Sequence, residues 1–262
     1  MNEYSNTLKK KLKEGKTVFG TWSSFGSPQV MNCIAQTGMD FIITDMEHGS
    51  STLETVESQL NYSEVAGTNL IVRLGELDDL AILQALDLGA KSIMVSHVSS
   101  AKDAKKVVNA TMYSPEGNRG LSPFTRNHGY SDEDISRKMA YANSQIFKGI
   151  LVEGNDGIEN LEEICKTPYL DMVYLGIYDI SQSVGEPGNV EHSKVKKILS
   201  NCVKIINDNG LIAGSVARNK DYMDLLINLG FRFISYRNDT SILHESFLKA
   251  KNEFDFLVKD KK

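Results

Sequence analysis

Eight short apolar segments recur along the chain, each followed by a polar loop and then by an amphipathic helical pattern. In order they cover residues 18–22, 41–43, 70–72, 92–95, 149–152, 172–175, 211–214 and 233–236. Their apolar residues are consecutive rather than alternating, which is typical of strands buried on both faces of a parallel sheet. This alternation of strand and helix constrains the fold more than any other feature of the sequence.

Glycines strengthen this pattern, because a helix that turns back into a sheet often ends at a residue that tolerates a positive φ. Five glycines stand a few residues before a predicted strand: Gly38, Gly67, Gly89, Gly210 and Gly230. Eight strands and a similar number of helices predict an α/β fold, a (β/α)8 TIM barrel, with residues 1–262 as a single domain. A doubly wound open sheet is the alternative, although no glycine-rich nucleotide-binding motif follows any of the strands.

One segment interrupts the regular alternation. Residues 113–145 begin with Tyr113-Ser114-Pro115-Glu116-Gly117 and continue through a polar loop. A connection of this length inside a compact barrel indicates a functional or an oligomeric role.

Composition excludes several classes of protein. The net charge is −5, and basic residues form only short runs near the two ends, so no nucleic-acid partner is expected. No run of 18 apolar residues occurs, so no membrane span is expected. The first residues are polar and lysine-rich, unlike a signal peptide, which favours a cytoplasmic location. Cys33, Cys165 and Cys202 form no CxxC pair and are expected to be buried thiols.

Ionisable residues follow four of the eight predicted strands, at the end of a barrel where function collects. Among them are Glu153 and Asp179, which follow the neighbouring fifth and sixth strands. Two converging carboxylates repel each other unless a cation or a proton lies between them. A hard divalent ion such as Mg²⁺ or Mn²⁺ suits such a pair, whereas helix capping or salt bridges at the rim are the structural alternative.

The second strand ends in Thr44-Asp45-Met46-Glu47-His48. A histidine oriented by a carboxylate is a common general base, so His48 with Asp45 is a candidate catalytic pair. A hydrogen-bonded loop histidine would explain His48 equally well.

Arg73 ends the third strand, and a guanidinium there must find an anion or a carbonyl group, either on a ligand or inside the protein. Asp45 and Asp87 are the candidate internal partners. Trp22 ends the first strand and is expected either to form a wall of the site or to pack against the mouth of the barrel.

A mechanism through a Schiff base needs a lysine that projects from a strand into the site. Lys91 and Lys148 precede their strands and would lie at the opposite end of the barrel, which favours a metal over an imine mechanism. The other histidines lack the spacing of metal ligands, and we expect structural roles for them: His97, His128, His192 and His244.

At this point the strand ends resemble those of a known family, the HpcH/HpaI aldolases, which are class II pyruvate aldolases related to 2-keto-3-deoxyglucarate and 4-hydroxy-2-oxoheptanedioate aldolases. The similarity runs from about residue 8 to about residue 250, with order and spacing kept. The matching motifs are Asp45-Met46-Glu47-His48, Val72-Arg73, Leu86-Asp87-Leu88-Gly89, Pro115-Glu116-Gly117-Asn118-Arg119-Gly120, Val152-Glu153 and Gly176-Ile177-Tyr178-Asp179-Ile180-Ser181-Gln182-Ser183-Val184-Gly185.

The resemblance implies a barrel of the phosphoenolpyruvate/pyruvate type and a role for each candidate residue. Glu153 and Asp179 would be the protein ligands of the metal ion, and Arg73 would hold the keto oxygen of pyruvate and stabilise the enolate. His48, paired with Asp45 or with Asp87 from a neighbouring subunit, would handle protons at the aldol hydroxyl. Backbone N–H groups around Gly176 and Tyr178 would receive the substrate carboxylate.

The resemblance further implies an aldolase that uses Mg²⁺ or Mn²⁺, with Co²⁺ as a third option, and that cleaves or forms 4-hydroxy-2-oxo acids through a pyruvate enolate. Its partners would be a 2-oxo acid and an aldehyde. The family forms hexamers, as trimers of dimers that exchange a C-terminal helix, a role that residues 241–255 could serve within a helix and tail at 241–262.

The sequence departs from the family pattern at three places. Leu151 stands where the family usually has glutamine, and Ile177 stands where it usually has proline. The end of the fourth strand, which is often Val-Pro in the family, reads Val95-Ser96-His97. The changes at Leu151 and Ile177 leave room for a different substrate. Two alternative functions follow: a citrate-synthase-like condensation of acetyl-CoA with oxaloacetate in siderophore biosynthesis, and a non-catalytic barrel that binds a small molecule.

Overall fold

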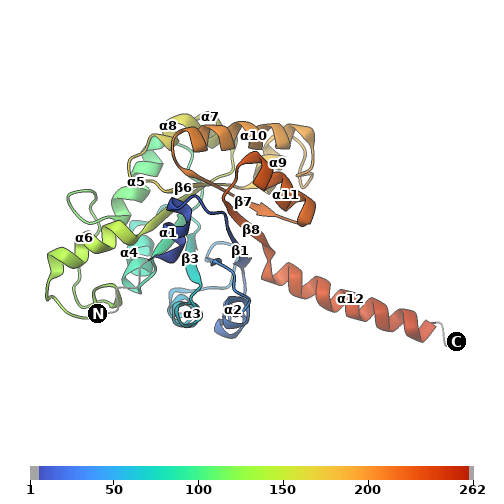
Figure 1. Cartoon of the computed structure of the whole chain (residues 1–262), viewed down its shortest axis with the longest axis horizontal. Coiled ribbons are helices and arrows are strands. Elements are labelled where there is room, and N and C mark those ends of the chain that lie inside the picture. Colours follow the sequence, from blue (N-terminus) through green and yellow to red (C-terminus); the bar gives the residue numbers. More distant parts are fainter. Residues whose placement is uncertain (1–5, 260–262) are drawn as a thin grey trace.

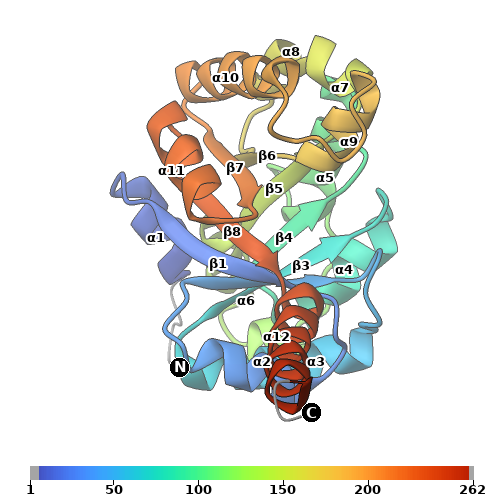
Figure 2. The ribbon, with the colours of Figure 1, turned by 90° about the vertical axis from the view of Figure 1, so that its right-hand side faces the viewer.

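The computed structural model describes residues 6–259 and contains a closed barrel of eight parallel strands in sequence order, which confirms the predicted (β/α)8 fold (Figures 1 and 2). The strands are β1 (Val18–Ser23), β2 (Phe41–Asp45), β3 (Asn69–Leu74), β4 (Ser92–Val95), β5 (Phe147–Val152), β6 (Met172–Leu175), β7 (Ile212–Ala217) and β8 (Phe233–Asn238). Pairing of β1 with β8, with Val18 opposite Phe233, closes the barrel and excludes the open sheet.

Helices follow the strands around the outside of the barrel. They are α1 (Thr7–Lys13), α2 (Pro28–Ala35), α3 (Leu53–Ala66), α4 (Asp79–Asp87), α5 (Ala101–Thr111), the short 3-10 helix η1 (Arg126–His128), α6 (Ile135–Gln145), α7 (Asn155–Glu159), α8 (Leu161–Cys165), α9 (Ile177–Ser183), α10 (Ser193–Asp208), α11 (Lys220–Leu229) and α12 (Asp239–Lys259). The five glycines predicted to precede strands all have a positive φ, as a helix C-terminus requires.

The interior of the barrel is filled at the N-terminal ends of the strands. Phe41 stacks on Phe233 with ring centroids 3.9 Å apart, and Phe147 stacks on Phe233 with centroids 6.4 Å apart. Leu8 and Leu12 of α1 are buried in the same apolar cluster and cover this end. Only the C-terminal ends of the strands are therefore left to form a cavity.

The long segment 113–145 belongs to the filled end of the barrel. Asn143 donates to the Tyr113 carbonyl, and the Asn6 amide donates to the Gln145 carbonyl, which ties the segment to the chain before α1. Lys148 lies at this end as well, since its Nζ donates to Ile146 O at 3.1 Å. The predicted position of Lys148, away from the catalytic end, is therefore confirmed.

The prediction of three buried thiols is correct for two of them. Cys165 and Cys202 are buried, and burial raises the pKa of their thiols to about 12 and about 11. Cys33 is exposed, so the prediction is wrong there. The buried residues of α2 are Met31 and Ala35, which lie about one turn apart. Cys33 lies midway between them and therefore faces the opposite side of the helix.

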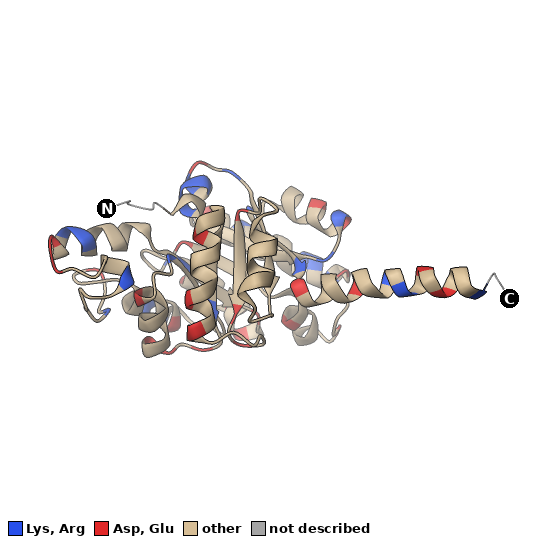
Figure 3. Cartoon of the chain, turned by 90° about the horizontal axis from the view of Figure 1, so that it is seen from below, with Lys and Arg blue, Asp and Glu red and all other residues tan. Residues whose placement is uncertain are grey.

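The last helix, α12, projects away from the barrel over most of its length (Figures 1 and 3). Its apolar side chains are largely exposed: Leu243, Phe247, Leu248, Phe254, Phe256, Leu257 and Val258. Within residues 6–259, no helix has the length and apolar character needed to cross a membrane. The cytoplasmic location expected from the sequence stays a prediction.

Replacing Gly20 of β1 with alanine should destabilise the barrel. A Cβ at this position would lie 2.2 Å from the Phe41 carbonyl oxygen, so the backbone would have to move. We expect the free energy of unfolding to fall by about 1–3 kcal/mol, as for other overpacked cores. Chemical denaturation measures the change. Gly154→Ala is the control, because its Cβ would meet nothing within 4 Å and its φ is −104°; equal stability of the two variants would contradict the close packing at β1.

Candidate active site

A cavity of about 770 Å³ opens at the C-terminal ends of the strands. It brings together eight of the nine residues that the sequence singled out: Trp22, Asp45, His48, Arg73, Glu153, Gly176, Tyr178 and Asp179. In the part of the chain that the structure describes, no lysine lines the cavity, which agrees with a mechanism without an imine.

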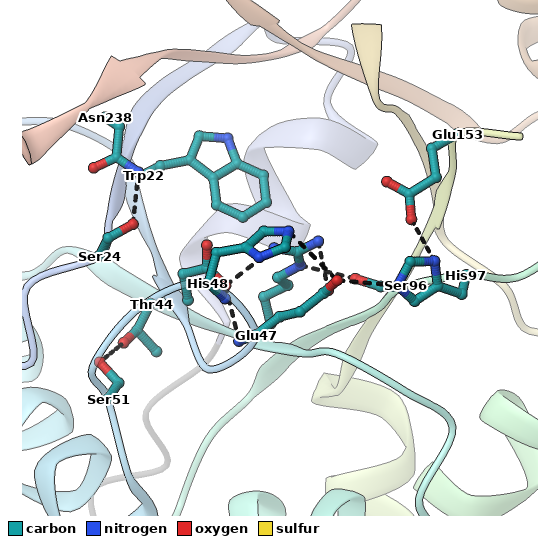
Figure 4. Close-up of polar contacts among 12 residues, drawn as sticks. Trp22, Ser24, Thr44, Glu47, His48, Ser51, Ser96, His97, Glu153 and Asn238 are labelled. Atoms are coloured by element: carbon teal, nitrogen blue, oxygen red, sulfur yellow. Dashed lines mark hydrogen bonds and ion pairs between the residues drawn. The ribbon is translucent and has the colours of Figure 1, made fainter. Parts of the chain in front are cut away.

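Arg73 is the most enclosed of these side chains. Its Nη1 donates to Asp45 at 3.0 Å, its Nη2 lies 2.5 Å from Glu47 Oε2, and its Nε donates to Ser96 Oγ at 2.8 Å (Figure 4 shows the surrounding contacts). The predicted internal pairing with Asp45 is therefore present. A guanidinium has five N–H donors, so two remain for a ligand in the cavity that Arg73 lines.

The Trp22 ring lies against the Arg73 guanidinium. The Arg73 Cζ lies 5.4 Å from the centroid of the Trp22 ring, within the range of a cation–π contact. The indole N–H donates to Tyr174 Oη at 2.9 Å and to Ser235 Oγ at 3.0 Å, which fixes the ring. Burial raises the pKa of Tyr174, so its hydroxyl stays protonated. Trp22 therefore both walls the cavity and packs against the barrel mouth.

Asp45 holds the loop after β2 rather than the histidine ring. Its Oδ1 accepts the backbone N–H groups of Glu47 at 3.0 Å and His48 at 3.1 Å, in addition to Arg73. The His48 ring is 73% exposed, and its Nε2 lies 3.5 Å from Glu47 Oε1. The structure therefore corrects the predicted pairing of the His48 ring with the Asp45 side chain. The Asp45 carboxylate faces the backbone of its own loop, because it accepts the N–H groups of the residues two and three positions ahead.

Asp87 is the one predicted residue that lies outside the cavity. It ends α4, and its Oδ1 accepts from Arg119 Nη2 at 2.6 Å. The side chain of Arg119 is fully buried beneath this contact and lies over the Tyr113 ring. Internal pairing of Arg73 with Asp87 is therefore excluded. A contribution of Asp87 to the active site of a neighbouring subunit stays a prediction.

His97 is a site residue that the sequence analysis missed. Its Nε2 lies 3.0 Å from Glu47 Oε1 and its Nδ1 lies 2.8 Å from Glu153 Oε1, so it connects two acidic side chains across the mouth of the barrel (Figure 4). We expected a structural role because His97 has no partner at ligand-like spacing. Its partners Glu47 and Glu153 follow β2 and β5, and His97 itself follows a predicted strand. That position at a strand end was the signal in the sequence that could have identified His97 as a site residue.

The Glu153 carboxylate has the properties of a cation ligand. Among the described residues its buried Oε1 forms no hydrogen bond, and its contact with His97 Nδ1 at 2.8 Å is an ion pair only when the imidazole is protonated. Burial raises the pKa of Glu153, and the charge of Asp179 acts in the same direction. A Cβ at Gly176 would lie 3.0 Å from Glu153 Cβ and 3.2 Å from its Oε2, so a larger residue there would crowd the carboxylate.

The carboxylate oxygens of Glu153 and Asp179 fit a hard divalent ion that completes its coordination with water and substrate oxygens. Glu153 and Asp179 both line the cavity. Across residues 6–259, no group of three or more His, Cys, Asp or Glu side chains is arranged to hold a metal ion, so the protein would supply few of the ligands.

The predicted binding site for the substrate carboxylate, at the backbone N–H groups where α9 begins, needs one change. The Gly176 N–H donates to Val152 O at 3.1 Å and extends the pairing of β5 with β6, so it is not available to a substrate. No side chain of the described residues caps α9, which leaves the N–H groups of its first turn, including that of Tyr178, for a ligand. Leu151 and Ile177 line the cavity as an apolar wall.

A closed barrel with carboxylates and a buried arginine at the C-terminal ends of its strands defines an enzyme of the TIM-barrel class. The model of the HpcH/HpaI aldolase/citrate lyase family matches residues 18–245. The chain belongs to this family, which confirms the expected class, a class II aldolase acting as a carbon–carbon lyase.

Relatives and a solved structure agree with this assignment. The chain is 31% identical over 242 residues to a 2-keto-3-deoxy-L-rhamnonate aldolase from Salmonella gallinarum, covering 92% of this chain and 90% of that protein. It is 30% identical over 239 residues to a hydroxypyruvate/pyruvate aldolase from Roseobacter denitrificans, covering 91% and 93%. The crystal structure of the citrate synthase SbnG has a TM-score of 0.85 at 26% identity, covering 95% of this chain and 98% of that one.

Glu153→Gln should raise the melting temperature of the metal-free protein at neutral pH. Because the folded state raises the pKa of Glu153 above its ordinary value of 4.5, folding favours the neutral carboxyl. The stability that this neutral form contributes is fully present below the unfolded pKa and is lost as the pH rises through the folded pKa. The glutamine stays neutral, so its advantage should grow as the pH rises from below the ordinary carboxyl pKa of 4.5 towards neutrality.

Thermal unfolding in the presence of a chelator measures this difference. Glu159→Gln, at an exposed position of the neighbouring α7, is the matched control and should show no comparable pH-dependent gain. A Glu153→Gln variant that is less stable than the wild type at every pH would show that the ionised carboxylate has favourable partners in the metal-free site.

Proposed function

We propose that the protein cleaves or forms 4-hydroxy-2-oxo acids through a pyruvate enolate, with Mg²⁺ or Mn²⁺, or alternatively Co²⁺, held by Glu153 and Asp179. The observation that carries the proposal is the buried Glu153 carboxylate, which has an oxygen without a hydrogen bond and shares a cavity with Asp179 and Arg73. The substrates are small molecules, a 2-oxo acid and an aldehyde.

Arg73 supplies the positive charge that this chain itself brings to the reaction. When bound, a divalent ion supplies Lewis acidity to the 2-oxo group and the carboxylate of the substrate. The free N–H donors of Arg73 bind the oxygen on which enolate charge develops. Asp45, Glu47 and Ser96 hold the guanidinium in place before the substrate arrives, and such preorganised donors need no rearrangement during the reaction.

His48 handles the proton at the aldol hydroxyl. In the cleavage direction the exposed imidazole takes the proton from the 4-hydroxyl group, the C3–C4 bond breaks, and its electron pair becomes the enolate of pyruvate. The aldehyde leaves, and a proton added at C3 completes the methyl group. Glu47, 3.5 Å from the ring, orients His48 within one chain. Asp87 of the partner subunit is the second candidate for this orienting role, as the family resemblance implies.

A second candidate function is the condensation of acetyl-CoA with oxaloacetate. The likeness to the citrate synthase SbnG favours it, as does the apolar wall formed by Leu151 and Ile177. Release of a free thiol from acetyl-CoA, rather than of an aldehyde from a 4-hydroxy-2-oxo acid, would identify this reaction. A non-catalytic barrel would bind ligands without either release.

We further propose that the protein forms a hexamer in which α12 packs on a neighbouring subunit. The helix has 21 residues, its only buried side chain is Asp239, and its large apolar residues face solvent. Exposed apolar surface of this extent is typical of a protein interface. Residues 241–259 are the described part of the predicted exchange segment, whose last three residues lie outside the described chain.

Deuterium should exchange into the methyl group of pyruvate only when a divalent ion is present. Exchange reports the enolate step whatever the second substrate is. Arg73→Lys should slow this exchange about 10²- to 10³-fold, because the lysine keeps a charge beside Asp45 and Glu47 but loses the donors aimed at the enolate oxygen. Proton NMR measures the rate. Arg137→Lys, at an exposed position of α6, is the control; metal-independent exchange would rule out the proposed chemistry.

The double variant Phe247→Glu, Phe254→Glu should dissociate the assembly into smaller species. The two residues are 69% and 60% exposed in one chain, so new charges there leave the barrel intact but prevent burial against a neighbour. Analytical ultracentrifugation measures the mass. Lys204→Glu, on the exposed face of α10, is the control. The exchange of α12 would be contradicted if the wild type were a monomer, or if the double variant had the same mass as the wild-type assembly.

A further inference from the structure

Three polar side chains form a closed set of hydrogen bonds where the cavity meets the apolar interior of the barrel. They are Trp22 of β1, Tyr174 of β6 and Ser235 of β8. The indole N–H donates to Tyr174 Oη at 2.9 Å and to Ser235 Oγ at 3.0 Å, and the two hydroxyl oxygens lie 2.6 Å apart. Trp22 and Tyr174 also line the cavity. The proposed mechanism assigns this polar cluster no role.

Tyr174 has a fixed place in the cluster. It is 1% exposed, and burial raises the pKa of its hydroxyl group, which therefore stays protonated. Its ring meets the rings of Trp22 and Phe233 edge to face, at centroid distances of 5.6 Å and 6.1 Å. A Cβ at Gly214 would lie 2.9 Å from Tyr174 Cδ2, so the glycine leaves room for the ring. The hydroxyl group is therefore held at one point beside the indole.

The hydroxyl groups of the cluster set the orientation of the indole. An indole N–H is a donor only, so its acceptors decide how the ring is turned. Both of its acceptors in the structure are hydroxyl oxygens of buried residues, Tyr174 and Ser235. Removing the Tyr174 hydroxyl would leave the N–H with one acceptor and the ring with more freedom to rotate.

The oriented indole contacts Arg73, whose Cζ lies over the Trp22 ring at 5.4 Å from its centroid. The hydrogen-bonding and ionic partners of the guanidinium lie at the ends of β2 and β4: Asp45, Glu47 and Ser96. The indole adds a contact from β1. A contact with a ring face uses none of the N–H donors, so the two that remain for a ligand stay free.

We infer that Tyr174 is a positioning residue of the aldol reaction. Its hydroxyl group fixes the indole of Trp22, and the indole holds the guanidinium of Arg73 with its free donors towards the enolate oxygen. This inference rests on the proposed function and adds a residue to it. The Tyr174 hydroxyl is engaged within the cluster, so its effect on the reaction is transmitted through Trp22.

Fluorescence tests the first step, because Trp22 is the only tryptophan of the chain. Tyr174→Phe keeps the ring and removes the hydroxyl group, so time-resolved fluorescence anisotropy should show a faster and wider motion of the indole than in the wild type. Tyr222→Phe is the matched control. Tyr222 is equally buried, belongs to α11 and donates its hydroxyl to Val190 O. An indole that moves alike in Tyr174→Phe and the wild type overturns the inference.

Turnover tests the second step, measured as metal-dependent exchange of pyruvate protons. Tyr174→Phe should lower kcat about threefold to tenfold, the effect of one hydrogen bond. KM and the Kd of Mn²⁺ should stay within about twofold, because the interaction strengthens in the transition state. Ser235→Ala removes the other acceptor and should act in the same direction. Tyr222→Phe should keep the wild-type kcat, and a Tyr174→Phe variant that loses thermal stability but keeps kcat has lost only a structural contact, which overturns the inference.

A double-mutant cycle shows whether Tyr174 acts through Trp22. Trp22→Phe removes the indole N–H, so the double variant Trp22→Phe, Tyr174→Phe should have the kcat of Trp22→Phe alone. Losses that multiply would mean that Tyr174 reaches the ligand by another route. Such a result in an enzyme with metal-dependent exchange removes the positioning role alone, whereas a wild type without exchange removes the aldol reaction and the positioning role with it.

Discussion

The buried ion pair of Arg73 with Asp45 and Glu47 is the interaction on which the catalytic end of the barrel depends. A guanidinium taken out of water at the end of β3 needs charged partners, and the removal of one partner leaves the others uncompensated. Since Asp45 and Glu47 lie at the end of β2 and Ser96 follows β4, one side chain connects three strand ends. The same contacts that stabilise the charge also orient it towards a ligand.

Filling of the barrel at its opposite end determines where chemistry can occur. The stacked rings of Phe41 and Phe233, with Leu8 of α1 beneath them, leave no space at the N-terminal ends of the strands. Substrate therefore has access to the strands only from the face that carries the ionisable residues. Lys148 illustrates the separation, because it is buried at the filled end, where its Nζ donates to Ile146 O and lies 3.3 Å from Asp171 Oδ2.

The cavity divides its charges by strand. Glu153 and Asp179 after β5 and β6 form an acidic side, and Arg218 and Arg237 after β7 and β8 form a basic side. A cation at the first and an anion at the second would each meet the opposite charge.

The sequence by itself determined the barrel and most positions of the site. Consecutive apolar residues and helix-ending glycines are local signals, so they predicted the strands, and strand ends located Arg73, Glu153 and Asp179 at one face. Only the tertiary structure decided which side chains meet there. His97 reaches Glu47 and Glu153 across strands, and Asp45 binds backbone rather than the ring of His48. Such contacts depend on register between strands and on loop conformation, which neighbours along the chain do not specify.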